Sequence, residues 1–148
     1  MAVLDERRPA GIDDPAGVAP TPLPDGVDML EVGTANQTKL TGRPVTGPLF
    51  EFAPAIDRFL KAHLFGDIFA RDNLDWPSRE IATIAALATL TGTESQLQSH
   101  LNIGLHTGLT KTQPRDLVQV IRTEIGQQQG ETADRILDQV LTNRQETP

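Results

Sequence analysis

The segment WPSREIATIAALATLTGTESQLQSH, residues 76–100, constrains the fold more than any other part of the sequence. Apolar side chains fill residues 81–90 with few interruptions, between an Arg-Glu pair and a His. Pro77 suits the first turn of a helix, where its missing N–H costs nothing, and Gly92 suits the position after a helix end. We therefore predict a helix at about 78–91, apolar nearly all round, which is typical of a helix buried at the centre of a domain.

The residues that follow predict a second helix packed against the first. Thr93 and Gln96 have the spacing of a capping box, so this helix is expected over about 94–107. Because the connecting loop is very short, the two helices should form a central antiparallel helical hairpin. If both helices were straight and equal in length, Glu80 would lie nearer to the end of the second helix than to His100.

Three further segments also have helical spacing, and no sustained strand-like alternation competes with them. They are residues 54–70, a segment that begins near Thr110 or Thr112 and stops at Gly126, and a final amphipathic stripe. Pro114 favours Thr112 as the cap, since Pro114 then falls within the first turn. The side chains expected to face inward in the last two helices are Leu117, Val118, Ile121, Ile125, Ala133, Ile136, Leu137, Val140 and Leu141. The fold class predicted is all-α.

The first 48 residues differ in composition from the rest. They hold seven of the 11 prolines and few large apolar side chains. This composition predicts an irregular N-terminal arm, with room for a short ordered turn within 26–38. We expect a helical domain over residues 49–148.

Composition excludes several classes of function. The net charge is −7 and the 13 Lys and Arg residues form no block, so a nucleic-acid partner is not expected. The apolar run 81–90 is about half of the ~20 residues that span a membrane, so no membrane partner is expected either. The chain has no Cys, which rules out disulfides, thiolate nucleophiles and a CxxC redox pair. The first residues lack an apolar signal region, and the cytoplasm is the expected location unless a signal precedes them.

Five side chains could carry chemistry, and each also has an ordinary structural interpretation. Arg79 and Glu80 could lie in solvent at a helix start, where the helix dipole favours the carboxylate. His100 could be a hydrogen-bonded core histidine, and His106 could complement the negative end of its helix. His63 lies between two leucines and fits helix-surface packing. Histidines on separate turns do not have metal-ligand spacing, so no metal is predicted.

The order of features over residues 64–113 resembles the central region of the carboxymuconolactone decarboxylase family. An Arg-Glu pair opens an Ala- and Leu-rich helix, a short polar loop follows, then a His, and then a Gly-x-x-x-Gly-Leu-Thr segment at 104–110. The resemblance implies an all-α fold shared with the alkylhydroperoxidase-like proteins. It also implies a homo-oligomer, a trimer or hexamer in which helical hairpins pack across subunits.

The founding activity of that family is loss of carbon dioxide from 4-carboxymuconolactone, a step in the breakdown of aromatic acids. The resemblance thus implies a small carboxylate or lactone as substrate. A peroxidase branch of the same fold uses Cys-x-x-Cys with a nearby His. Thr93 and Gln96 stand in place of those thiols here, so thiol peroxidase activity is excluded.

By resemblance, Arg79, Glu80 and His100 occupy the polar positions of the family site, and His106 stands where lactone decarboxylases tend to have another polar residue. Decarboxylation needs a cation for the substrate carboxylate and a general acid for the carbon that loses carbon dioxide. Arg79 suits the first role, and His100 or His106 suits the second, with Glu80 to orient the imidazole. No cofactor is required, because a lactone carbonyl can accept the electrons.

Three other interpretations stay open at this stage. The same scaffold could run a different acid/base reaction, such as isomerisation or ring opening of a small cyclic acid. It could be a non-catalytic helical oligomer that binds a small ligand or a partner. A metal-dependent variant would bind a divalent ion through the histidines and Glu80.

Overall fold

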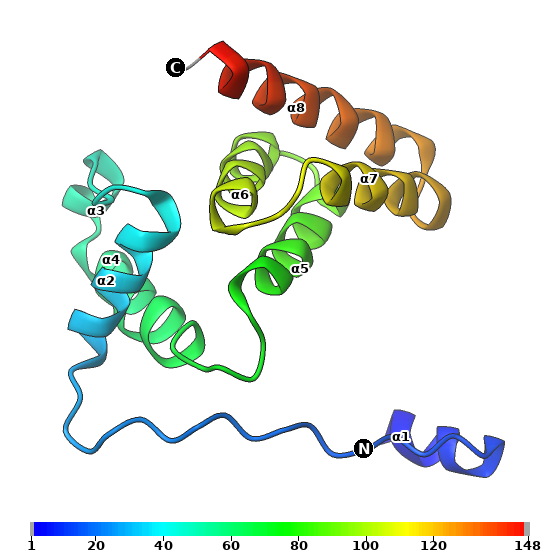
Figure 1. Cartoon of the computed structure of the whole chain (residues 1–148), viewed down its shortest axis with the longest axis horizontal. Helices are drawn as coiled ribbons and strands as arrows, with labels where there is room; N and C mark the ends of the chain where they lie inside the picture. The colour runs from blue at the N-terminus through cyan, green and yellow to red at the C-terminus, as the bar shows by residue number, and fades with distance from the viewer. Residues whose placement is uncertain (1, 147–148) are drawn as a thin grey trace.

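The computed structural model describes residues 2–146, and Figure 1 shows helices joined by loops of very different length. The helices are α1 (Ala2–Arg7), the 3-10 helix η1 (Arg8–Ala10), α2 (Met29–Thr41), α3 (Pro48–Phe52), α4 (Pro54–Phe59), the π-helix η2 (Leu60–Ile68), α5 (Trp76–Thr89), α6 (Glu94–Thr107), α7 (Thr112–Glu124) and α8 (Gln127–Glu146). The described residues contain no strand, and the predicted all-α class is confirmed. None of these helices is both long and apolar enough to cross a membrane.

The core lies where α5, α6, α7 and α8 pack together (Figure 1). The stripe predicted for the last helix is confirmed, because all five of its apolar residues are buried and Leu137 is 0% exposed. In α7, Val118 and Ile121 are buried as predicted. Ile125 is half exposed and the prediction for it was wrong, because α7 ends at Glu124 and the chain turns toward α8.

The central hairpin is confirmed as α5 and α6, but α5 is not buried all round. Ile84 and Ala88 face the core, whereas Ala82 and Ala86 are exposed and Leu90 is 60% exposed. The prediction of complete burial was wrong for the single chain, because α6, α7 and α8 cover only part of the α5 surface. One apolar side of the helix therefore stays open.

The caps of these helices differ from the predicted ones. At the start of α5, the Asp75 carboxylate accepts a hydrogen bond of 2.8 Å from the Ser78 N–H. Thr93 does not cap α6, because its hydroxyl donates back to the Leu87 carbonyl at 2.8 Å and so ties off the end of α5. The predicted capping box is therefore absent.

Thr112 does not cap α7 either, because it is the first residue of that helix. The Gln113 side chain accepts a hydrogen bond of 2.8 Å from the Thr110 N–H instead. Pro114 does fall in the first turn as expected. The glutamine side chain thus bonds the backbone two residues before the helix, and the Lys111 side chain at the cap position does not cap α7.

The N-terminal 48 residues are irregular only in part. Residues 12–24 are extended, as expected, but the short turn predicted within 26–38 is the 13-residue helix α2. The Asp28 side chain caps its start by accepting from the Leu30 N–H, and Gly42, with φ 76°, ends it. The domain boundary at residue 48 stays a prediction.

The helix α2 packs closely on η2, which occupies much of the predicted segment 54–70. A Cβ on Gly33 would overlap the Lys61 carbonyl oxygen, and one on Gly66 would lie 2.6 Å from the Met29 carbonyl oxygen. The predicted helix is thus present, but its second half has wide π turns, in which the Phe69 N–H donates to Leu64 O at 3.0 Å. The widened turns occur where the two backbones come closest.

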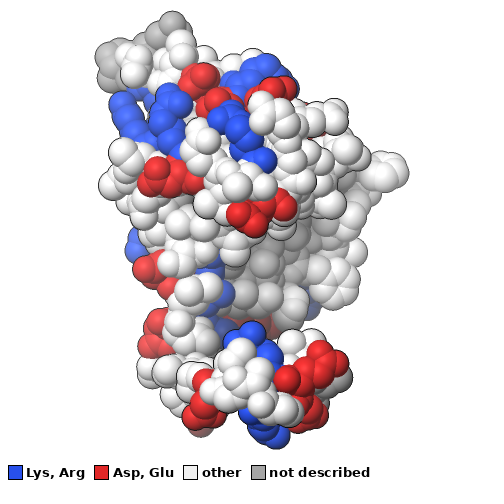
Figure 2. Space-filling model, turned by 90° about the vertical axis from the view of Figure 1, so that its right-hand side faces the viewer, with Lys and Arg blue, Asp and Glu red and all other residues white. Residues whose placement is uncertain are grey.

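Charged side chains cover the outer surface of α7 and α8. Arg115 pairs with Asp138 at 2.9 Å, and Arg122 pairs with Asp134 at 3.0 Å. Figure 2 shows basic and acidic groups interspersed at the upper end of the molecule, rather than gathered by sign. Exposed pairs of this kind typically contribute ~0–1 kcal/mol each, so they orient α8 on α7 more than they stabilise it.

Candidate functional site

The structure brings together two of the four predicted site residues, Glu80 and His100. Glu80 lies just after the first turn of α5, and its side chain points between α5 and α6 and is 1% exposed. His100 lies at the middle of α6, at the edge of the face that carries Leu97 and Leu101 into the core. One Glu80 carboxylate oxygen is 2.8 Å from His100 Nδ1.

This contact contradicts the expectation from straight and equal helices, in which Glu80 would lie nearer the end of α6. The two helices form the hairpin, but Figure 1 shows them inclined to each other rather than parallel. The interpretation of Glu80 as a solvated helix-start residue was also wrong, since its side chain is buried.

The contact between Glu80 and His100 determines which ring nitrogen of the histidine carries a proton. A buried carboxylate is costly unless a hydrogen-bond donor satisfies it, so it favours the ring form of His100 that carries a proton on Nδ1. Nε2 on the other side of the ring is then the atom that can accept or release a proton. The imidazole is 31% exposed, so solvent or a ligand can reach it while the carboxylate stays covered.

Arg79 does not join this pair within the chain. Its guanidinium donates to the carbonyl of Leu74 at 3.0 Å and to that of Arg71 at 3.2 Å. It also lies over the Phe69 ring, 5.7 Å from the ring centroid. These contacts tie the loop before α5 to the start of that helix.

The same loop holds two carboxylates at the mouth of α5. The Ser78 side chain and N–H bond the Asp75 carboxyl and hold its pKa below the usual range. Hydrogen bonds from the hydroxyl and N–H of Thr21 lower the pKa of Asp72 in the same way. The N-terminal arm is thereby fastened to this loop.

His106 lies one turn and a half further along α6 than His100 and faces a different neighbour. Its ring packs against the turn after α2, where a Cβ on Gly42 would lie 3.3 Å from His106 Cε1. His106 also lines a cavity together with Arg43 and Arg144. The position of His106 in the last turn of α6 fits the helix-end interpretation, but the sequence did not indicate that two arginines share a cavity with it.

The third histidine, His63, is on the surface of η2. Its Nδ1 is 3.0 Å from an Asp67 carboxylate oxygen, one turn along the same helix, and its side chain is largely exposed. Within the described residues, no three His, Asp or Glu side chains gather as metal ligands would. His63 therefore has an acidic partner but no enclosed surroundings.

Sequence reasoning did not find Arg43 or Arg144 as candidate binding residues. They come from the turn after α2 and from the end of α8, so no local spacing links them. Lys39 and Trp76 were missed in the same way, although the Lys39 ammonium lies 5.0 Å from the Trp76 ring centroid. Only the three-dimensional arrangement shows these pairs.

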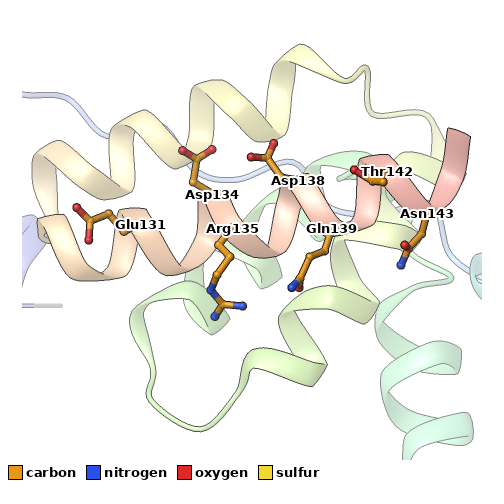
Figure 3. A pocket seen from close by; sticks show the side chains of 7 residues that line it. All are labelled: Glu131, Asp134, Arg135, Asp138, Gln139, Thr142 and Asn143. Atoms are coloured by element: carbon orange, nitrogen blue, oxygen red, sulfur yellow. The ribbon is translucent and has the colours of Figure 1, made fainter.

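A hollow of about 590 Å³ on α8 also lies near charged groups. Figure 3 shows that Asp134 and Asp138 point toward α7, whereas Arg135 and Gln139 point the opposite way. All seven of its lining residues come from α8 itself, so it is an open helix surface rather than an enclosed site.

The Glu80–His100 pair lies within a segment that matches a known protein family. The model of the carboxymuconolactone decarboxylase family matches residues 54–139, from the start of α4 to the middle of α8. This match includes both Glu80 and His100 and covers more than half of the chain. The comparison with curated proteins gave no match.

Proposed function

The chain belongs to the carboxymuconolactone decarboxylase family, and from this membership we propose that it is an acid/base enzyme that needs no cofactor. The proposed substrate is a small cyclic carboxylic acid or its lactone, and the proposed reaction is decarboxylation or related lactone chemistry. The observation that supports it most is the hydrogen bond of 2.8 Å between the buried Glu80 carboxylate and the accessible His100 imidazole.

His100 suits the role of general acid. When the bond between the substrate carboxylate and its ring carbon breaks, carbon dioxide leaves and the electron pair moves into the lactone carbonyl. The electron pair then returns from the carbonyl to a ring carbon as that carbon takes the proton on Nε2 of a protonated His100, and a proton from solvent restores Nε2. A positioned proton donor of this kind typically contributes ~10²- to 10⁴-fold to the rate.

Glu80 suits a positioning role. It fixes the ring through Nδ1, so Nε2 points away from the carboxylate. Because Glu80 is 1% exposed, it would not contact the substrate itself. The carboxylate is thus expected to act through His100.

Arg79 stays a predicted carboxylate ligand by resemblance to the family. To bind a substrate carboxylate, its guanidinium would exchange at least one of the carbonyls of Arg71 and Leu74 for that ligand. His106 stays a second predicted proton donor, although it faces the turn after α2 rather than Glu80.

The test is the mass of the product formed from 4-carboxymuconolactone and from related cyclic acids. We expect the loss of one carbon dioxide, and we expect His100→Gln to lower kcat by about 100-fold or more. Glu80→Gln should lower it less, because a glutamine still accepts a hydrogen bond from Nδ1 but carries no charge. His63→Gln is the matched control, since His63 also pairs with an acid but lies on an exposed helix surface.

Two results would redirect the proposal. A product of unchanged mass would favour isomerisation or ring opening by the same pair. Turnover that is equal in wild type and His100→Gln would remove His100 from the chemistry altogether.

A second candidate function is a non-catalytic helical oligomer that binds a small ligand or partner. The observation that favours it is the exposure of large aromatic side chains, with Phe52 at 89% and Phe59 at 71%. Under this interpretation, Glu80 and His100 hold α5 to α6 and no candidate acid is turned over. The mass experiment distinguishes the two.

A further inference from the structure

A cavity of about 720 Å³ lies between α6, the turn that follows α2, and the end of α8. The α6 residues that line it include Ser99, Ile103 and His106, which share one face of the helix at spacings of four, three and seven. His100 lies about a quarter turn away from this face and does not line the cavity. The cavity is therefore separate from the Glu80–His100 pair.

The cavity wall carries positive charge, although the chain as a whole has a net negative charge. The chain has 20 acidic and 13 basic residues, yet among the residues whose side chains the structure describes, the wall contains Arg43 and Arg144 and no Asp or Glu. His106 adds a third group that can carry positive charge. A wall with these positive groups attracts an anion.

The two arginines keep most of their hydrogen-bonding capacity. Among the described residues, none accepts a hydrogen bond from the Arg43 guanidinium or forms an ion pair with it. Arg144 gives one long hydrogen bond, 3.4 Å, to the Asn102 carbonyl. A guanidinium has five N–H donors in a planar fork that fits a carboxylate, so both side chains can bind one.

The rest of the wall is mixed, with apolar residues beside polar ones that carry hydroxyl or amide groups: Leu40, Pro44, Val45 and Ile103, and Thr41, Thr46, Ser99 and Asn102. Leu40, Val45 and Ile103 face the same space as the arginines. A site with a few charged donors beside apolar side chains suits a ligand that has a carboxylate and a hydrocarbon body, and the volume falls in the range of small-molecule sites, ~300–1,000 Å³. An inorganic anion would leave the apolar part unused.

The turn that closes this cavity has a special backbone. Gly42 has φ 76°, a conformation that side-chain-bearing residues rarely adopt, and it lets the chain pass directly against the His106 ring. The turn 42–46 is thus held at contact distance from α6. This side of the cavity wall is therefore formed by a turn that contacts α6.

We propose that this cavity binds a small organic acid through Arg43 and Arg144. Both arginines lie outside residues 54–139, so the segments that flank the family domain supply the charged part of the site. The proposal does not depend on the reaction assigned to Glu80 and His100. A site here could supply a ligand-dependent control or hold an acid near α6.

The experiment is calorimetric titration of the full chain with benzoate, benzamide and inorganic phosphate. Benzamide has the shape of benzoate without its charge, and phosphate has the charge without the hydrocarbon body. We expect benzoate to bind with saturation in the range up to about 1 mM, and benzamide and phosphate to bind at least about tenfold more weakly, since charge-assisted bonds and apolar contact each contribute. Absence of saturable benzoate binding in this range, or equal binding of either control compound, overturns the proposal.

The double variant Arg43→Met/Arg144→Met locates the site. It should weaken benzoate binding by about tenfold or more, because the charge-assisted hydrogen bonds are lost while much of the side-chain length stays. Its matched control is Arg58→Met/Arg135→Met, which removes the same charge from positions outside the cavity. Both proteins should keep the thermal midpoint of the wild type, and an affinity equal to that of the control places any benzoate site elsewhere and overturns the proposal.

Discussion

Glu80 and His100 form a hydrogen bond between a buried carboxylate and a partly exposed imidazole. A carboxylate that is 1% exposed has little water to satisfy it, so the Nδ1 hydrogen bond offsets part of its desolvation. The same bond fixes the imidazole plane and leaves Nε2 accessible. One contact thus joins α5 to α6 and fixes the ring of the proposed proton donor.

Asp72 gives a pH-dependent prediction at the residue scale. Its carboxylate accepts hydrogen bonds from the Thr21 hydroxyl at 2.6 Å and from the Thr21 N–H at 2.9 Å, and these lower its pKa from the ordinary value of 3.8. A lowered pKa means that the contact is fully present above 3.8 and is lost as the pH falls through the lowered value. We expect the Thr21 amide shift in NMR to titrate with a midpoint below 3.8.

Two variants check the assignment of that titration. Asp72→Asn should abolish it, and Asp25→Asn, a change in the same region, should leave it in place. A Thr21 midpoint at or above 3.8 would contradict the contact.

The sequence singled out two polar residues that do lie together, but it did not predict the contacts of the others. Glu80 and His100 stood out because polar groups bracket an apolar helix, and they do meet. Arg79 stood out for the same reason but bonds loop carbonyls, which no spacing indicates. Arg43 and Arg144 were not found, because a cavity wall built from the two ends of a chain has no sequence period.

At the scale of secondary-structure elements, two glycines allow α2 and η2 to pack closely together. Gly33 meets the Lys61 carbonyl oxygen, and Gly66 meets the Met29 carbonyl oxygen, so the two backbones touch without side chains between them. This kind of contact gains dispersion energy from close approach and leaves little apolar periodicity in the sequence. That is why the residues of α2 were expected to form only a short turn.

Gly33→Ala tests this packing. The added methyl group would overlap backbone, which cannot move as a side-chain end can, so we expect destabilisation by about 1–3 kcal/mol despite the better helix propensity of Ala. Urea unfolding measures the free energy. Gly17→Ala is the control and should be neutral, because Gly17 lies in the extended arm and a Cβ added there would have no neighbour within 4 Å. Equal stability of Gly33→Ala and wild type would show that α2 does not pack on η2 in this way.

The elements that were well predicted are those that bury an amphipathic stripe within the chain. For α8, the spacing of apolar residues and their burial agree at every position. Caps were predicted less well, because Thr93 could serve either of two helix ends and the loop geometry assigned it to the end of α5. The π turns of η2 were not predicted, since they arise where another backbone packs and not from composition.

At the scale of the whole molecule, the exposed apolar side chains are unevenly placed. Leu49, Phe52, Ile56 and Phe59 follow one another at intervals of three and four residues along α3 and α4, and all four are exposed. Figure 1 shows α3 at the edge of the molecule, away from the core of α5 to α8. An exposed set of this size is more typical of an interface than of a monomer surface.

We therefore expect the chain to self-associate through α3 and α4, in keeping with the homo-oligomer predicted by resemblance. Burying a Phe side chain contributes ~1.5–3 kcal/mol, so Phe52→Ser/Phe59→Ser should raise the dissociation constant of the oligomer by at least about tenfold. Sedimentation equilibrium measures it. Since Phe52 and Phe59 are exposed in the single chain, the variant should fold normally, and Val120→Ser, which changes an exposed residue of α7, should leave association unchanged. A wild-type chain that stays monomeric, or a double variant that associates as tightly as Val120→Ser, would mean that α3 and α4 face something other than a second copy.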